Sequence, residues 1–573
     1  MLFNIEINDQ QVSAKRGETI LTILNRNGIK VPTLCFLSKF FPTGACRMCV
    51  VEVDGQSELV PACSYQVEEW MKIKTHSPRV LKARKTLVEL LLSSHPDDCL
   101  YCNRNGNCEL QTLAKELNVD QRMYRTKRSF IQIDKSCPSI ERDPSKCILC
   151  GRCIRVCDEI IGVSAIDIIG RGTKSRIGTS HNKGLNTSYC VKCGQCIIVC
   201  PTNALSERSQ VQSVLDALNN PTLYPVVQFS PAVAASIGED FCIKSSKEVP
   251  GLLKTALKKM GFRQVYDTAF SADINIIEQA AEFMDRLSKN ESLPYFISSC
   301  PSWVKYIETL RPRFIPNLSH VKSPQQIMGT TIKRFISRSA GLQPENVFVV
   351  SVMPCTSNKY EAGNDGIPGS EKKYVDSVIT TRELVRLINL LGIDFTNLEP
   401  EPMETAFSIG SSSGKIASIS GGTLEGLLRS VYPLLTGQEM GNLKIPELRG
   451  LKGIKEARLK AGKQILNVAA VSGLGNAKSL LDEIEAGRND LHIVEIMACP
   501  FGCINGGGQR IGSDEKYLKS RMKILYDIDE DEMIRTSHKN PVVLNLYEKF
   551  LGKPFCEQNQ EFFYSIHHQS EIK

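Results

Sequence analysis

Two copies of one cysteine pattern constrain the fold of this chain more than any other feature. The gaps between successive cysteines are two, two and three residues in both copies, which are Cys147, Cys150, Cys153, Cys157 and Cys190, Cys193, Cys196, Cys200. In such a pattern three thiolates clasp one [4Fe–4S] cluster and the fourth crosses to a second cluster. We therefore predict one cluster on Cys147, Cys150, Cys153 and Cys200, and another on Cys190, Cys193, Cys196 and Cys157. Cys137 lies outside the pattern and is expected to be a spare thiol.

The composition favours metal binding over disulfide bonds. The chain has 573 residues, of which 42% are hydrophobic, and most of its 22 cysteines fall in clusters. We find no export signal at the start and no apolar run near the ~20 residues that cross a bilayer. A cytoplasmic protein whose clustered cysteines bind metal is therefore expected. The net charge of +8 is small for this length and argues against a nucleic-acid partner.

Residues 1–80 are predicted to form a small β-rich domain with its own metal site. Residues 3–8 and 50–53 alternate as strands, and residues 18–27 have helical spacing. Four cysteines, two of them close together, suit a [2Fe–2S] cluster, with zinc as the alternative. The predicted ligands are Cys35, Cys46, Cys49 and Cys63.

Residues 81–125 are predicted to hold a further cluster after a helix over residues 80–93. One imidazole and three thiols follow that helix, from His95, Cys99, Cys102 and Cys108. This set can bind zinc or a [4Fe–4S] cluster, and we favour the cluster. A neutral imidazole in place of a thiolate makes such a site less negative, which raises its reduction potential.

Residues 209–514 alternate between buried strands and helices, which predicts α/β lobes with parallel sheets. Strands are expected at residues 226–229, 295–297, 347–353 and 492–497, and helices at residues 382–391 and 423–430. Three of these strands run into cysteines, namely Cys300, Cys355, and the pair Cys499 and Cys503. Because sites in open α/β sheets form beyond the carboxyl ends of strands, the four could share one more [4Fe–4S] cluster.

The sequence also allows predictions for residues beside and beyond these cysteines. Lys359 would place a cation near an anionic ligand, and the glycines at 506–508 would let a bulky group approach bare backbone. Residues 515–573 have a polar, helical pattern, in which His567 and His568 are expected to be solvated. Cys242 and Cys556 have no partners in spacing and are expected to be structural.

The stretches 298–303, 353–359 and 495–509 together resemble the three signature motifs of [FeFe]-hydrogenases. The cysteine sets before them match the larger form of that family, which has four accessory clusters. The resemblance implies a multidomain α/β plus α+β fold: a β-grasp ferredoxin-like [2Fe–2S] domain (1–80), a His/Cys3 [4Fe–4S] domain (81–125), a two-[4Fe–4S] ferredoxin-like domain (126–208), a two-lobed catalytic domain (209–514) and a small-subunit-like helical segment (515–573).

The same resemblance implies an oxidoreductase that couples 2H⁺ + 2e⁻ to H2 reversibly at a six-iron cluster. In the family the four cysteines hold a cubane, and the last, Cys503 here, bridges to a two-iron subsite with CO, cyanide and azadithiolate. Lys359 would hydrogen-bond one cyanide, and Ser230 with Pro231 would lie near the other. The pocket would be lined by Gln325, Met353 and Met497. Ferredoxin or an NADH-linked subunit would exchange electrons, and maturation proteins would supply the subsite.

This sequence departs from the family in its proton relay. The usual relay is a cysteine, a glutamate, a serine and a second glutamate, and the matching residues are Ser299, Gln279, Ser319 and Glu282. A serine hydroxyl is far less acidic than a thiol with a pKa near 8.5, and an amide does not titrate in this range, so slower turnover is expected. Two alternatives stay open: a hydrogen sensor with low turnover, and an electron-transfer subunit resembling the large cluster subunit of NADH–quinone oxidoreductase.

Overall fold

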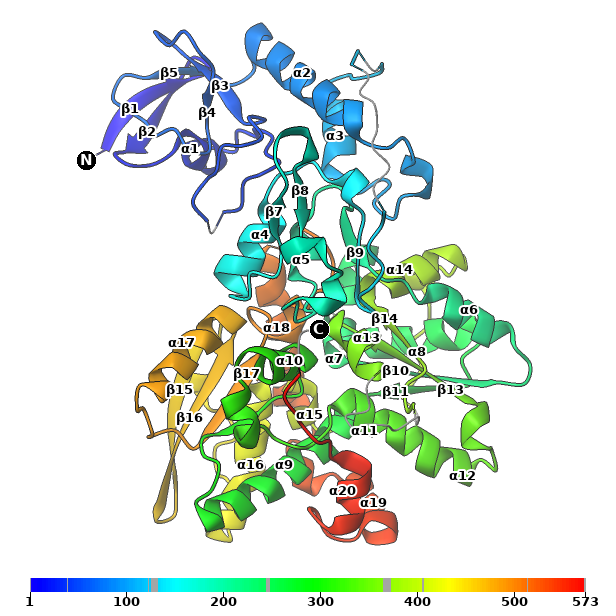
Figure 1. The fold of residues 1–573 in the computed structure, drawn as a ribbon. Helices are drawn as coiled ribbons and strands as arrows, with labels where there is room; N and C mark the ends of the chain where they lie inside the picture. Colours follow the sequence, from blue (N-terminus) through cyan, green and yellow to red (C-terminus); the bar gives the residue numbers. More distant parts are fainter. Residues whose placement is uncertain are drawn as a thin grey trace.

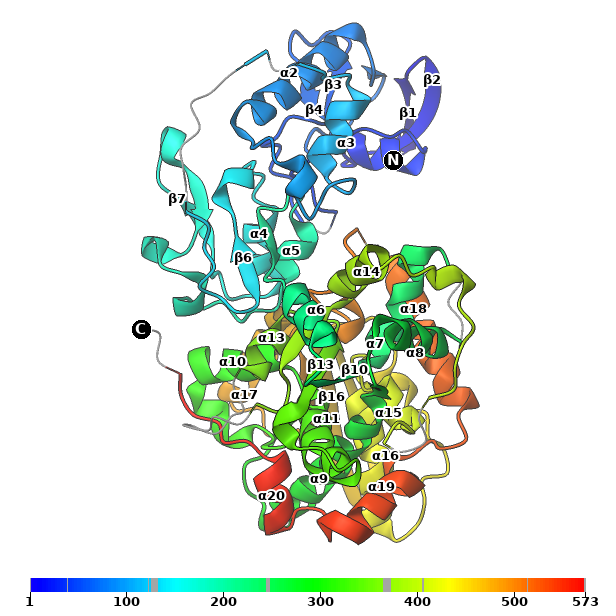
Figure 2. The ribbon, with the colours of Figure 1, turned by 90° about the vertical axis from the view of Figure 1, so that its right-hand side faces the viewer.

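The computed structural model places small domains above a large two-lobed body (Figures 1 and 2). It describes residues 2–38, 40–121, 123–124, 132–243, 248–363, 373–403, 407–512 and 514–570. The predicted domain boundary between residues 125 and 126 lies outside these ranges. Among the described helices, none is long and apolar enough to cross a membrane. The fold is a multidomain mixture of α and β structure, as the sequence predicts.

The N-terminal sheet begins with a tight hairpin. Its strands are β1 (Leu2–Ile7), β2 (Gln10–Lys15), β3 (Val50–Val53), β4 (Val60–Pro61) and β5 (Lys72–Lys74), in the order β2-β1-β5-β3-β4. Asn8 and Asp9 between β1 and β2 have φ values of 50° and 65°, as the central residues of a type I′ turn require. Helix α1 (Ile20–Arg26) starts later than predicted because the side chain of Thr19 caps it.

The two cysteine repeats adopt the same local backbone. Helices α2 (Pro78–Ser94) and α3 (Glu109–Glu116) precede them. The antiparallel pair of β6 (Ile140–Arg142) and β9 (Leu205–Glu207) flanks the two copies, and the pair of β7 (Asp167–Ile169) and β8 (Arg176–Gly178) lies between them. Gly151 and Gly194 each follow the second cysteine of a copy, with φ values of 74° and 73°. Each glycine caps a helix, α4 (Arg152–Arg155) or α5 (Gln195–Val199). The repeated spacing therefore encodes a repeated conformation that favours glycine.

The first lobe is built on a parallel sheet buried on both faces. Its strands are β10 (Tyr224–Phe229), β11 (Gln264–Asp267), β13 (Val347–Met353) and β14 (Ser377–Thr380), in the order β11-β10-β13-β14. Val227 and Val350 pack into one core and Val226 and Val349 into another, so these strands read as continuous apolar runs. Its helices are α6 (Val211–Asn219), α7 (Pro231–Ile237), α8 (Val249–Met260), α11 (Pro324–Thr331), α12 (Ser337–Ser339), α13 (Ser357–Ala362) and α14 (Thr381–Leu390).

The second lobe has a mixed sheet, which corrects the expectation of purely parallel sheets. Its strands are β12 (Tyr295–Ile297), β15 (Ile454–Ala461), β16 (Gln464–Ser472) and β17 (Ile493–Met497), in the order β12-β17-β16-β15. The edge strand β15 pairs antiparallel with β16 because Gly462, with φ of 61°, turns the chain back between them. The helices are α9 (Ala269–Lys289), α10 (Pro301–Leu310), α15 (Ser412–Ile416), α16 (Gly422–Thr436) and α17 (Leu474–Glu485).

The C-terminal segment is helical, as predicted, and is tied firmly to the lobes. It contains α18 (Glu515–Asp531), α19 (Pro541–Leu546) and α20 (Glu557–Phe563). Asp529 on α18 forms a fully buried ion pair with Arg429 at 2.8 Å. Beyond α20 the chain rises toward α10 (Figure 1), where the His567 side chain is only 8% exposed. The expectation that His567 is solvated is therefore wrong, whereas His568 is exposed.

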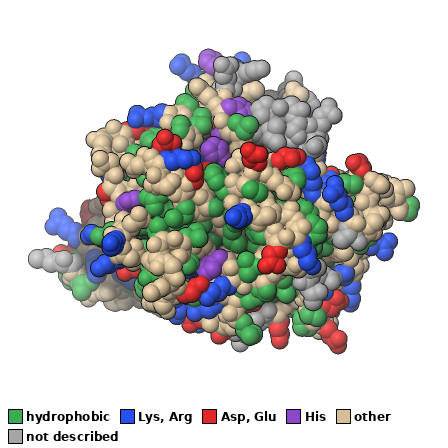
Figure 3. Space-filling model, turned by 90° about the horizontal axis from the view of Figure 1, so that it is seen from below, with side chains coloured by type: hydrophobic (Ala, Val, Ile, Leu, Met, Phe, Trp, Pro, Cys, Tyr) green, Lys and Arg blue, Asp and Glu red, His purple; other side chains and the backbone are tan. Residues whose placement is uncertain are grey.

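The surface carries no large field of one sign on the face seen from below, where acidic and basic side chains are interspersed (Figure 3). This agrees with the small net charge of +8. Cys242, which was expected to be structural, is exposed, whereas Cys137 is buried.

Candidate active site

Three strand ends from the two lobes bring four cysteines around one cavity. Strands β12 and β17 of the second lobe lead to Cys300 and Cys499, and β13 of the first lobe leads to Cys355. Together with Cys503 these side chains line a cavity of about 90 Å³. Its walls also include the predicted pocket residues Ser230, Pro231, Gln325, Met353 and Met497.

Short hydrogen bonds fix the loops that carry the cysteines. The hydroxyl of Ser298 donates to the carbonyl of Ile496 at 2.5 Å and accepts from the Cys300 N–H at 3.1 Å. The Cys503 N–H donates to the carbonyl of Ser418 at 3.0 Å. Two of these bonds, from Ser298 and from Cys503, tie the loops that carry Cys300 and Cys503 to distant segments of the chain.

Glu495 anchors strand β17 to the start of α16. Its carboxylate accepts from the N–H groups of Gly421 and Leu424, both at 2.7 Å. Burial raises the pKa of Glu495 to about 7. Hydrogen bonding to helix N–H groups stabilises the charged form, so Glu495 is a structural carboxylate behind Cys499.

The glycines at 506–508 approach other backbone segments closely, and Gly506 also lines the cysteine cavity. A Cβ on Gly506 would lie 2.3 Å from the carbonyl oxygen of Pro354, and one on Gly507 would lie 2.1 Å from that of Cys193. The expectation for these glycines therefore holds for Gly506, whereas Gly507 lets the segment after Cys503 dock against the ferredoxin-like domain.

Lys359 does not face the cavity, which corrects its expected place there. Its ammonium group donates to the carbonyl of Val378 at 2.7 Å and pairs with Glu383 at 2.8 Å, with both side chains fully buried. The preceding residue, Asn358, lines the cavity instead. Adjacent positions on a helix point in different directions, and the start of α13 at Ser357 decides which of them faces the cysteines.

The predicted relay residues form only part of a connected chain. Ser299 makes a hydrogen bond of 3.5 Å to Asn275, and neither amide atom of buried Gln279 has a hydrogen-bond partner among the described residues. Ser319 and Tyr295 both donate to the Glu282 carboxylate, at 3.0 and 2.7 Å. Ser319 and Glu282 are therefore together, but the structure does not link them to Ser299 through Gln279.

Glu282 is held in its ionised form. Arg286 pairs with it at 2.7 Å and His320 contacts the same oxygen at 2.9 Å. Burial opposes ionisation, but the hydrogen bond from His320 and the charge of Arg286 outweigh it and lower the pKa of Glu282 to about 2. A carboxylate this acidic carries protons poorly near neutral pH.

Some of the predicted accessory ligands lie close together in the structure. The set Cys147, Cys150, Cys153 and Cys200 lines one small cavity. Cys35 interacts with Cys46, and Cys49 with Cys63. His95 is buried, whereas Cys99 is exposed. Among the described residues, no three His, Cys, Asp or Glu side chains are close enough to hold a single metal ion. Ligands of a polynuclear cluster bind different irons and so stand farther apart.

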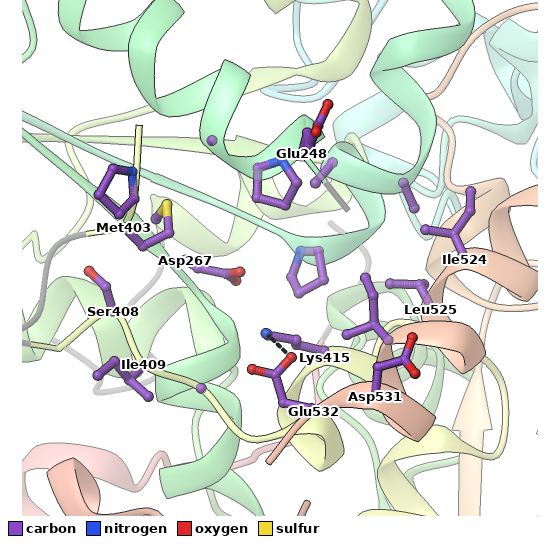
Figure 4. Close-up of a pocket in the computed structure, with 18 of the residues that line it drawn as sticks. Glu248, Asp267, Met403, Ser408, Ile409, Lys415, Ile524, Leu525, Asp531 and Glu532 are labelled. Carbon is purple, nitrogen blue, oxygen red and sulfur yellow. Dashed lines mark hydrogen bonds and ion pairs between the residues drawn. The ribbon is translucent and has the colours of Figure 1, made fainter. Parts of the chain in front are cut away.

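A much larger cavity lies near α7 and shares Pro231 with the lining of the cysteine cavity. It has a volume of about 860 Å³. Asp267 and Met403 lie at its left in Figure 4, Glu248 at its top, and the ion pair of Lys415 with Glu532 below. No cysteine is among the described residues that line it.

Comparison with known proteins identifies the family. The model for the iron only hydrogenase large subunit, C-terminal domain, matches residues 224–507. The NADP-reducing hydrogenase subunit HndD of Solidesulfovibrio fructosivorans is 39% identical over 98% of this chain and 98% of its own. The chain belongs to the [FeFe]-hydrogenase family. Iron hydrogenase 1 of Clostridium pasteurianum is 37% identical over 96% of this chain and 97% of its own.

Other parts of the chain also match known domains. Residues 2–78 match a 2Fe-2S iron-sulfur cluster binding domain and residues 84–122 an iron-sulfur region of NADH-ubiquinone oxidoreductase. Residues 137–206 match a ferredoxin-like domain of NADH-quinone oxidoreductase, and residues 515–564 the iron hydrogenase small subunit. A solved variant of [FeFe]-hydrogenase HydA1 from Chlamydomonas reinhardtii is 32% identical, with a TM-score of 0.57 over 63% of this chain and 99% of its own.

The residues present fit the cluster that hydrogenases of this family carry. Four thiols surround one cavity, and the described residues lining it include no Lys, Arg or His. The buried side-chain oxygen of Gln325 has no described hydrogen-bond partner. Sequence reasoning did not find Asn275, Asn358, Tyr295 or His320, because their roles depend on contacts between distant segments.

Proposed function

We propose that this chain catalyses the reversible reaction 2H⁺ + 2e⁻ = H2. The observation that supports this most is the convergence of Cys300, Cys355, Cys499 and Cys503 on one cavity from strand ends in both lobes. Four thiolates are the usual donors of a [4Fe–4S] cluster. An electron-transfer subunit alone would not need a further cysteine-lined cavity enclosed by two α/β lobes.

The four cysteines would hold the cubane, with Cys503 bridging to a two-iron subsite that carries CO, cyanide and azadithiolate. When bound, that group supplies the metal and the amine at which dihydrogen is made or split. The protein orients the group and sets the electrostatic environment around it. Three neutral donors that line the cavity, Gln325, Asn358 and Ser230, would orient its anionic ligands. Met353 and Met497 would exclude water.

The accessory sites would pass electrons along the small domains. One [2Fe–2S] and three [4Fe–4S] clusters are proposed on the cysteine sets and His95 named above. Arg104 donates to the carbonyl of Cys200 at 2.7 Å, which joins the His/Cys3 domain to the ferredoxin-like domain. The matches to NADH oxidoreductase domains and to a subunit of an NADP-reducing hydrogenase support a nicotinamide-linked partner, with ferredoxin as the alternative.

A sensor of hydrogen is the second candidate. A sensor needs little turnover, and two features favour slow proton delivery. Ser299 stands in place of a thiol, and Glu282 is held in an ion pair with Arg286. The continuous set of accessory sites favours electron throughput instead. Steady-state H2 rates with reduced ferredoxin or NADPH-linked partners separate an enzyme from a sensor.

The proposal is tested by expression with maturation proteins followed by gas assays. The wild-type protein should evolve and oxidise H2, and Cys503→Ser should abolish both activities. Exposed Cys242→Ser is the matched control and should leave both unchanged. Activity that survives in Cys503→Ser would refute the proposed site.

A further inference from the structure

A second cavity adjoins the cysteine cavity and opens toward the C-terminal tail. It also has a volume of about 90 Å³, room for about three water molecules at ~30 Å³ each. Ser299, Cys300, Pro301 and Ser323 line both cavities. The two spaces therefore meet at the position where the family's relay cysteine is replaced by Ser299.

A carboxylic acid stands at the inner end of this second cavity. Glu361 on α13 lines it and accepts a hydrogen bond from Gln325 at 2.9 Å and a longer one from Asn358 at 3.4 Å. Gln325 and Asn358 both line the cysteine cavity. Burial raises the pKa of Glu361 to about 7, against hydrogen bonds from Ser323 and Asn358. Unlike Glu282, this carboxyl has no cation within ion-pairing distance among the described residues.

Titratable groups also line the outer end. His567 from the tail lies 2.9 Å from the carbonyl of Ser319 through one ring nitrogen and 3.5 Å from Glu308 through the other. The Ser570 N–H donates to the carbonyl of Glu308 at 2.9 Å, which holds the tail in place. Exposed His568 completes the mouth, and Lys305 and Lys322 are the cations that face the cavity.

We propose that protons reach the active site of this chain through this second cavity, with Glu361 as the relay carboxyl and Glu308 with His567 at its entrance. A proton taken from water at the entrance moves along water in the cavity to the Glu361 carboxylate. The resulting carboxylic acid gives its proton toward the cysteine cavity past Ser323 and Ser299, and the carboxylate is restored. No electron moves in these steps. The inference depends on the proposed function.

The first test measures the protonation of the Glu361 carboxyl directly. It uses protein that carries the accessory clusters but lacks the two-iron subsite. Infrared difference spectra across pH 5 to 9 should show a carboxylic C=O band that titrates and shifts in D2O, and Glu361→Gln should lack it. Exposed Glu345→Gln is the matched control and should keep the band. An unchanged band in Glu361→Gln would overturn the proposal.

The second test uses matured protein. Glu361→Gln should lower H2 evolution at least about tenfold, as expected for loss of a general acid–base step, and Glu361→Asp should restore part of it. Glu282→Gln should cost less than Glu361→Gln, and the reverse order would overturn the route. Infrared bands of metal-bound CO and cyanide should persist in every variant. Their absence in wild-type protein would instead contradict the proposed function, which separates the two failures.

Discussion

The sulfur of Cys355 lies 3.8 Å from the carbonyl oxygen of Cys193. Cys355 is a proposed ligand of the active-site cubane, and Cys193 a proposed ligand of the second ferredoxin-like cluster. Two hydrogen bonds hold the surrounding segments together. Gln195 donates to the carbonyl of Asn505 at 2.7 Å, and Thr356 donates to the carbonyl of Lys192 at 2.8 Å. The ferredoxin-like domain is thus joined to the active site through the ligand loops themselves.

Gly507→Ala should disturb this junction. Its Cβ would lie 2.1 Å from the Cys193 carbonyl oxygen, so one backbone must move. We expect a loss of about 1–3 kcal/mol in stability, as for overpacked sites, and slower reduction of the active-site cluster by the accessory clusters. Stopped-flow reduction measures this rate. Gly441→Ala, where nothing lies within 4 Å, is the control and should match wild type.

Lys359→Met and Asn358→Ala should have separate effects. Lys359 and Glu383 form a fully buried pair, so removing the lysine leaves an unpaired carboxylate and should cost about 3–5 kcal/mol. Asn358→Ala should leave stability nearly unchanged but shift the infrared bands of the bound ligands, because Asn358 lines the cavity. Denaturation and infrared spectra of both variants check this. A band shift of equal size in Lys359→Met without loss of stability would contradict the assignment.

The contribution of Glu282 to stability should depend on pH. Its pKa in the folded protein is lowered to about 2, below the ~4.3 of an unperturbed glutamate, and each unit is worth about 1.4 kcal/mol. The stabilisation is present above pH ~4.3 and is lost as the pH falls toward 2. The stability difference between wild type and Glu282→Gln, on the order of 3 kcal/mol at pH 7, should therefore shrink on acidification. Urea titrations of both proteins at several pH values measure this difference. A difference that stays constant as the pH falls would contradict the prediction.

Ser299→Cys with Gln279→Glu should raise H2 evolution, because a thiol and a carboxyl are better proton carriers than a hydroxyl and an amide. Gln279→Glu alone should reduce stability, since it buries a carboxyl at a position without described hydrogen-bond partners. The double variant and both single variants are compared in H2 assays and thermal melts. If the double variant is no faster than wild type, Ser299 and Gln279 do not limit turnover.

Local patterns in the sequence predicted much of the fold, and contacts between distant segments account for what was missed. The strands before Cys300, Cys355 and Cys499 are found because buried strands have a clear apolar signature. Lys359 was expected near the cluster, but the neighbouring residue Asn358 lines the cavity instead. The sequence does not show this, since the start of α13 depends on tertiary packing. His567 was expected in solvent, because nothing near it in sequence shows that the tail returns to Ser319.

The glycines at 506–508 show the same limit. A glycine run predicts a close approach, and the structure has one, but the sequence does not say what approaches. Here the partner is the backbone of Cys193 and Pro354, from segments far away in the chain.

The most direct test of the central claim is an infrared spectrum of the matured protein, recorded with H2 added and then removed. If the four cysteines hold a hydrogen-converting cluster, bands of metal-bound CO and cyanide should appear, change with H2 and return when H2 is withdrawn. Matured protein without such bands, while its accessory clusters are intact, would contradict the account.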